Sequence, residues 1–163
     1  MQKQSPKRLR AIAHHEAGHV VAAHRAGRDI RQVQISAEAF EDGSFGKTQH
    51  LNPIFGQELD DGDPRLTEYG DAELIIALAG PEAESRLDPK RTIAPSDQAE
   101  VDRILGATIN LSQAEKEKYL RWARRVARQI VEDDWPAIQR VAAALLEHGS
   151  LSGDEVAQLT PRP

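Results

Sequence analysis

The chain has 163 residues, 39% hydrophobic and 29% charged, as expected for one globular domain with a single core. Its net charge of −5 argues against nucleic acid as a partner, and no apolar run reaches the roughly 18 residues that span a bilayer. Cysteine is absent, which excludes disulfides, thiolate ligands and a thiol nucleophile, and no signal peptide follows the basic N-terminus. We therefore expect a cytoplasmic single domain over residues 1–163.

The first half of the chain is predicted to contain helices and a small sheet. Ser5 and Pro6 are a helix start signal and Gly27 a stop signal. Alternating apolar and polar residues after Gly27 predict a half-buried strand, and Pro81 is expected to kink the second helix or end it early. The expected elements are a helix from Ser5 to Gly27, strands Ile30–Ile35 and Phe45–Leu51, a loop Pro53–Pro64 and a helix Thr67–Leu87.

The second half of the chain is predicted to be helical throughout. Ser112 with Glu115, and Ser152 with Glu155, match the capping box that opens a helix. The expected helices run from Ser96 to about Asn110, from Ser112 to about Asp134, from Asp134 to about Gly149, and onward from Ser152. The fold class is therefore mainly α (α+β), with a small β-sheet near the N-terminus.

The first helix carries the metal-binding motif H-E-x-x-H at His15–His19. Histidines four positions apart lie one helical turn apart on the same side and can chelate one ion. A helical wheel places His15 and His19 together beside Glu16, continuous with an apolar face. His14 falls on the opposite side and is predicted to be a solvated surface residue. The competing interpretation of the motif is a pair of partly buried histidines with ordinary hydrogen-bond partners.

Zinc chemistry follows from these residue types. Two neutral imidazoles and one further ligand leave zinc an open position for water, whose pKa the ion lowers to about 7. Glu16 is placed to take the proton of that water and pass it to a leaving amine. Without a partner, burying Glu16 on an apolar face would be costly, and a nearby ion would relieve that cost. A zinc hydrolase is therefore the favoured interpretation.

The third ligand stays open on spacing alone. The metzincin spacing would put a histidine at position 25, which is Arg25, so that class is excluded. Glu84 with Asp88 imitates the downstream acidic pattern of thermolysin-like enzymes. Asp97 lies in the first turn of a predicted helix, where a carboxylate also interacts favourably with the helix dipole. Spacing does not choose between these acids.

Several segments resemble the peptidase domain of the FtsH-type ATP-dependent zinc metalloproteases. The segment HHEAGHVVAA resembles the H-E-A-G-H helix of that family, and IRQVQIS followed by GSFGKTQHLNP is similar to its strand and edge segment. ELIIALAGPEAESRL and SDQAEVDRI resemble the next two family segments, and WPAIQRVAAALLEHGSLSGDEVAQL is similar to the C-terminal one. The likeness spans roughly residues 8 to 159. This sequence differs from the family at Pro81, where the family has arginine. It also differs in the stretch Gly106–Gln113, which is shorter than in the family.

The resemblance implies a zincin-like helical fold and assigns roles to particular residues. It makes His15, His19 and Asp97 the ligands of one Zn²⁺ and Glu16 the catalytic base. It also suggests that Glu84 orients a ligand histidine. It further implies that the segment Gly46, Lys47 and Thr48 is an edge strand beside the zinc that binds an extended substrate by strand addition.

The expected function is a zinc metalloendopeptidase that hydrolyses unfolded or extended polypeptides. The ATPase module and membrane anchor of the family have no counterpart in the sequence, so we expect a stand-alone peptidase domain. The expected partners are a polypeptide substrate, a separate ATPase or unfoldase chain, and further copies of this chain. Nucleic acid binding and membrane insertion are not expected. The alternative is a zinc-stabilised binding or regulatory module with little or no turnover.

Overall fold

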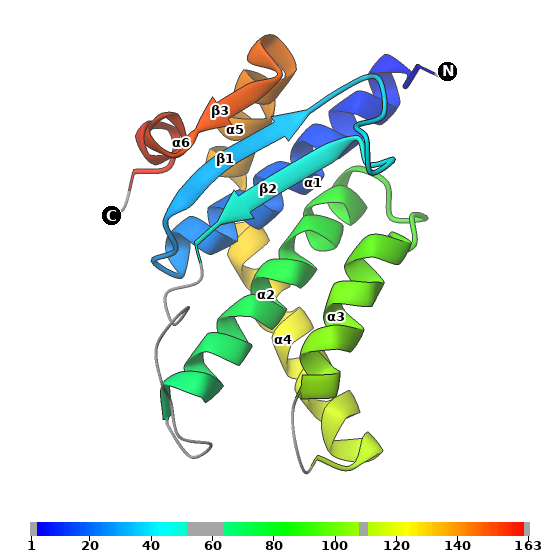
Figure 1. Ribbon diagram of the computed structural model, residues 1–163, viewed down its shortest axis with the longest axis vertical. Helices are drawn as coiled ribbons and strands as arrows, with labels where there is room; N and C mark the ends of the chain where they lie inside the picture. The colour runs from blue at the N-terminus through cyan, green and yellow to red at the C-terminus, as the bar shows by residue number, and fades with distance from the viewer. Residues whose placement is uncertain (1–2, 52–63, 108–110, 162–163) are drawn as a thin grey trace.

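The structure, a computed structural model, describes residues 3–51, 64–107 and 111–161. Within these ranges it consists of helices and one three-stranded antiparallel sheet (Figure 1). The mainly α fold with a small sheet is thereby confirmed. The elements are α1 (Pro6–Arg25), β1 (Ile30–Ile35), β2 (Gly46–His50), α2 (Pro64–Leu87), α3 (Pro95–Ala107), α4 (Gln113–Asp133), α5 (Trp135–His148), β3 (Ser150–Ser152) and α6 (Gly153–Leu159).

The sheet joins the two ends of the chain. Its strand order is β2-β1-β3, with both pairs antiparallel, so β2 is an edge strand. Val33 at the middle of β1 is fully buried and pairs with Thr48 of β2 and Leu151 of β3. The third strand was not predicted, because its three residues are too few to show an alternating pattern. One backbone edge of β2 is thus left without a strand neighbour in the described part of the chain.

Helix α1 is the centre of the fold. It packs against α2 and α5, and the sheet covers it as well (Figure 1). The approach of α1 to α2 depends on Gly18, because a Cβ atom there would lie 2.5 Å from the carbonyl oxygen of Ala79. The side chains on both flanks of α1 are therefore buried, which places its histidines inside the molecule.

The prediction that His14 is a solvated surface residue was wrong. His14 is only 6% exposed, its ring centroid lies 5.6 Å from that of Trp135, and its Nδ1 atom lies 2.9 Å from the carbonyl oxygen of Arg10. A helical wheel separates two faces but cannot show that a second helix covers the less apolar one. Here α5, which begins at Trp135, provides that cover.

Most predicted helix ends are confirmed, with three differences, the first being that α2 begins at Pro64, in the predicted loop, and not at Thr67. Both capping boxes are formed, and Ser5 caps α1. Pro81 does not end α2, which continues to Leu87 because its flanking residues are buried against α1 and α4. Helix α3 begins at Pro95, so Ser96 lies within its first turn and is not the cap. The predicted loop Pro53–Pro64, apart from its last residue, and the predicted end near Asn110 lie outside the described residues.

No helix in the described ranges has the length and apolar character required to cross a membrane. The larger hydrophobic cluster joins α1 to the sheet, α5 and α6, and a second cluster joins α2, α3 and α4. The predicted site residues lie along the line where α1, α2, α3 and β2 meet.

Candidate metal centre

The two motif histidines of α1 turn the same ring nitrogen toward each other. Their Nε2 atoms are 3.0 Å apart, while each Nδ1 atom has another partner. Nδ1 of His15 lies 2.9 Å from Oε2 of Glu84, and Nδ1 of His19 lies 2.7 Å from the carbonyl oxygen of Ile76. Because these oxygens only accept, both Nδ1 atoms carry hydrogens and donate. In the neutral rings the two Nε2 atoms then have lone pairs that face a common point, the arrangement that binds a metal.

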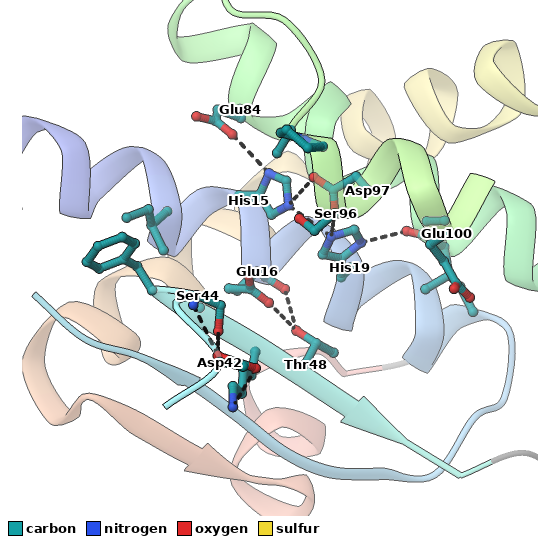
Figure 2. Close-up of a pocket in the computed structure, with 18 of the residues that line it drawn as sticks. His15, Glu16, His19, Asp42, Ser44, Thr48, Glu84, Ser96, Asp97 and Glu100 are labelled. Atoms are coloured by element: carbon teal, nitrogen blue, oxygen red, sulfur yellow. Dashed lines mark hydrogen bonds and ion pairs between the residues drawn. The ribbon is translucent and has the colours of Figure 1, made fainter. Parts of the chain in front are cut away.

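Asp97 reaches this point from the first turn of α3. Its Oδ2 atom lies 3.3 Å from Nε2 of His15, and its Oδ1 atom lies 3.6 Å from Nε2 of His19. One ligand atom from each of the three residues falls within 4.8 Å of the others. The three residues predicted as ligands are therefore brought together, although Asp97 is distant from the histidines in sequence. Figure 2 shows Asp97 and Glu84 on opposite sides of the His15 ring.

The electrostatics of this cluster favour a cation between its members. Burial lowers the pKa of His15, but the carboxylates of Asp97 and Glu84 outweigh that effect and raise the pKa to about 10. Burial raises the pKa of Asp97, but the contacts with His15 and His19 reverse the effect and hold it well below its usual range. In the described structure, Oδ2 of Asp97 is buried, and its contact with Nε2 of His15 at 3.3 Å is an ion pair without the geometry of a hydrogen bond. A divalent ion would replace the His15 proton and satisfy this oxygen, so the donor set fits a metal.

Glu84 lies where the resemblance suggested a partner for a ligand histidine. Its Oε2 atom accepts the hydrogen bond from His15, and its Oε1 atom accepts from Arg8 and from Nε of Arg91, the latter at 2.6 Å. Burial raises the pKa of Glu84, but the hydrogen bonds from His15 and Arg8 more than compensate and lower it to about 2. Glu84 is therefore a charged carboxylate, held at one oxygen and facing His15 with the other.

Glu16 is buried beside the histidines and held from β2. Only 7% of it is exposed, and its Oε2 atom accepts a hydrogen bond of 2.8 Å from Oγ1 of Thr48 (Figure 2). Gly46 leaves the room that Glu16 occupies, because a Cβ atom at Gly46 would lie 2.7 Å from Cγ of Glu16. The edge segment from Gly46 to Thr48 thus contacts the predicted base directly, which the sequence reasoning did not anticipate.

Two further contributions to the site escaped the sequence reasoning. Gly80 of α2 lies against the imidazole of His19, and a Cβ atom there would meet its Nε2 atom and lie 2.5 Å from its Cε1 atom. A glycine next to Pro81 within an apolar helix is a signal for such a close approach. The carbonyl of Ile76, which orients His19, could not be predicted from the sequence, because every residue type has a backbone carbonyl.

An open cavity of about 640 Å³ connects these groups. Its lining includes His15, Glu16, His19 and Asp97, together with the segment Gly46–Thr48 of the edge strand. A substrate in this cavity can therefore touch β2 and the proposed metal ligands at the same time. Comparisons with models of known protein families and with curated proteins find no match to this chain.

Proposed function

We propose that this protein is a zinc-dependent metalloendopeptidase that hydrolyses peptide bonds in unfolded or extended polypeptides. The observation that supports it most is the convergence of His15 Nε2, His19 Nε2 and the Asp97 carboxylate beside a buried, hydrogen-bonded Glu16. Two imidazoles and one carboxylate, with Nδ1 of each imidazole donating to an oxygen, form a ligand set typical of catalytic zinc sites.

The zinc ion would supply Lewis acidity, polarising the substrate carbonyl and making a water molecule acidic enough to attack at neutral pH. The remaining chemistry belongs to the side chains. Glu16 accepts the proton of the attacking water and delivers it to the nitrogen of the leaving amine. Thr48 holds Oε2 of Glu16 at 2.8 Å, which leaves Oε1 to exchange the proton. Glu84 keeps His15 in the tautomer whose Nε2 can bind the ion.

The edge position of β2 supports an extended polypeptide as the substrate. Its outer backbone edge has no strand neighbour among the described residues, and Gly46, Lys47 and Thr48 line the same cavity as the proposed ligands. An extended segment can add to such an edge through main-chain hydrogen bonds, which require no particular substrate sequence. A folded substrate keeps its main chain paired, so unfolded segments are the proposed class.

The resemblance to FtsH-type peptidases extends this proposal to partners. A separate ATPase or unfoldase chain would deliver unfolded substrate, and further copies of the chain would form a homo-oligomer. A cytoplasmic location and the absence of nucleic acid binding remain predictions from composition and charge. The partners, the oligomeric state and the location do not depend on the geometry of the proposed catalytic site.

Metal content and cleavage of an unfolded protein test the proposal. Zinc per chain and cleavage of casein are measured for the native protein and for Glu16→Gln, which keeps the size of the side chain. We expect equal zinc in both and cleavage only by the native protein. Cleavage by neither, with zinc retained, would instead support a zinc-stabilised binding module. Equal cleavage by both would exclude Glu16 as the base.

A further inference from the structure

The cavity that holds the proposed metal centre contains a second group of ionisable side chains outside the ligand set. His50 of β2, Glu73 of α2 and Glu100 of α3 all line it. We call these three residues the His50 cluster. Glu100 faces the same cavity as the other two members, and its pKa responds to the charges of both. Figure 2 shows Glu100 on α3, the helix that also carries Asp97.

The imidazole of His50 is fixed by Glu73. Its Nε2 atom lies 3.2 Å from Oε1 and 3.1 Å from Oε2 of that carboxylate. A carboxylate accepts, so Nε2 carries the hydrogen, and Nδ1 of the neutral ring is then an acceptor. The His50 side chain is 19% exposed and lines the cavity. The neutral ring therefore offers a substrate an acceptor in a fixed orientation.

A buried ion pair supports Glu73 from behind. Nε of Arg28 lies 3.1 Å from Oε1 of Glu73, both side chains are only 9% exposed, and Arg28 packs over the ring of Tyr69. Arg28 does not belong to the cavity lining. Glu100 forms an ion pair with Arg103, whose side chain is 62% exposed. Solvent therefore screens the charge of Arg103 and weakens this ion pair. At this end the cavity wall therefore presents acceptor atoms, including two carboxylates whose arginine partners lie outside the lining.

Each member of the His50 cluster lies two or three positions along its element from a residue that belongs to the proposed centre or contacts it. His50 is two positions beyond Thr48 on β2, a distance of about 6.6 Å along a strand. Glu73 precedes Ile76, whose carbonyl orients His19, by three residues of α2, a rise of about 4.5 Å. Glu100 likewise follows Asp97 by about one turn. Three elements thus each carry a polar group of the same cavity a short way along from the proposed centre.

We propose that the His50 cluster is a subsite that binds a basic side chain, lysine or arginine, of the substrate residue next to the scissile bond. The inference rests on the proposed peptidase function. An ammonium or guanidinium group donates hydrogen bonds to Nδ1 of His50 and to the carboxylates of Glu73 and Glu100. The whole cavity adds to this preference, because the six carboxylates that line it outnumber the positive charges of Arg8, Lys47 and a bound Zn²⁺.

The test compares extended peptides that differ at one position, which carries Lys, Gln or Glu. Their dissociation constants are measured on zinc-loaded Glu16→Gln protein, and cut sites in a peptide library are mapped for the native protein. We expect the Lys peptide to bind about fivefold more tightly than the Gln peptide, the size of one partly screened charge contact, and the Glu peptide more weakly still. Cut sites should have Lys or Arg on one fixed side of the scissile bond.

Variants of the cluster identify the residues responsible. Glu100→Gln, on a side chain that is 44% exposed, should remove most of the preference without disturbing the core. Glu100→Lys should reverse it in favour of the Glu peptide. The matched control is Glu147→Gln on α5, which removes the same charge from a side chain that is 76% exposed and outside the cavity lining. His50→Phe should lower the affinity for the Lys peptide while the zinc content stays the same.

The outcomes separate this inference from the proposed function. Tighter binding of Lys peptides without cleavage would support the subsite and contradict the peptidase. Cleavage with no preference for basic residues, or with a preference that Glu100→Gln and His50→Phe leave unchanged, would overturn the subsite alone. Failure of every peptide to bind would overturn it as well.

Discussion

Thr48 of β2 donates a hydrogen bond of 2.8 Å to Oε2 of Glu16 on α1, joining the edge strand to the proposed catalytic base. The contact is possible because Gly46, two positions earlier on the same face of β2, leaves room for the Glu16 side chain. The strand proposed to bind substrate is therefore also the strand that orients the base.

Replacing this hydroxyl group should slow catalysis without removing the metal. In Thr48→Val the side chain keeps its shape but cannot donate, so the buried carboxylate of Glu16 loses a hydrogen bond. Because hydrogen bonds to charged groups contribute about 1.5–3 kcal/mol, we expect casein cleavage to slow by roughly ten- to a hundredfold. Thr48→Ser should restore most of the rate. Gln49→Ala, on an exposed neighbour in the same strand, is the control.

A loss of bound zinc in Thr48→Val, or an unchanged rate, would contradict this role. The first result would mean that Thr48 supports the metal site itself. The second would mean that Glu16 keeps its position through packing alone.

Asp97 and Glu84 should differ in their effect on metal affinity. The carboxylate oxygens of Asp97 lie 3.3 and 3.6 Å from the Nε2 atoms of the two histidines, which are the proposed metal-binding atoms. Glu84, in contrast, contacts His15 only at Nδ1, on the far side of the ring. Asp97→Ala should weaken zinc binding by more than about a hundredfold, and Glu84→Ala by about ten- to a hundredfold. Asp102→Ala, an exposed aspartate on the same helix as Asp97, is the control. Competition with a chelator measures all three, and a larger loss in Glu84→Ala would overturn the assignment.

The site shows which kinds of information the sequence contains. The placement of His15, Glu16 and His19 beside one another was predictable because it depends on spacing within one helix. Asp97 is far from them in the chain, and spacing alone left several acids open; only the resemblance selected it. The structure then places its carboxylate beside the two histidines.

The errors share a physical cause, which is tertiary packing. The surface prediction for His14 failed because the helix that covers it begins at Trp135, far along the chain. Of the two effects predicted for Pro81, a kink or an early end of the helix, the early end is wrong because burial on both sides of α2 outweighs one missing hydrogen bond. The orienting carbonyl of Ile76 could not be predicted, because backbone groups carry no residue-specific signal.

The pKa shifts near His15 predict how the stability of the metal-free protein depends on pH. Folding raises the pKa of His15 from 6.5 to about 10, so its stabilising contribution is full below pH 6.5 and is lost as the pH rises toward 10. Folding lowers the pKa of Glu84 from 4.5 to about 2, so its contribution is full above pH 4.5 and is lost as the pH falls toward 2. The free energy of unfolding contributed by these groups should therefore be greatest between pH 4.5 and 6.5.

Zinc should remove the alkaline part of this dependence. A metal-bound His15 carries no proton at Nε2, so no proton is lost there as the pH rises. Urea unfolding of chelator-treated and zinc-loaded protein at about pH 5.5 and about pH 9 measures the difference. We expect the chelator-treated protein to lose stability between these values and the zinc-loaded protein to lose much less. Equal losses in both forms would show that His15 does not exchange a proton for the metal.

Gly80 should be required for metal binding and not for folding. A Cβ atom at Gly80 would meet the ring of His19, so Gly80→Ala must displace this ligand or shift α2. Alanine is otherwise favoured over glycine within a helix by about 1 kcal/mol, so the helix itself gains stability from the change. We expect zinc affinity to fall by at least about tenfold, as for other changes that misplace a ligand, while the far-ultraviolet circular dichroism is preserved. Gly70→Ala is the matched control on α2, because its Cβ atom would meet only the Tyr119 hydroxyl at 3.9 Å. Equal zinc affinities of the two variants would show that the contact between Gly80 and His19 relaxes at no cost to the site.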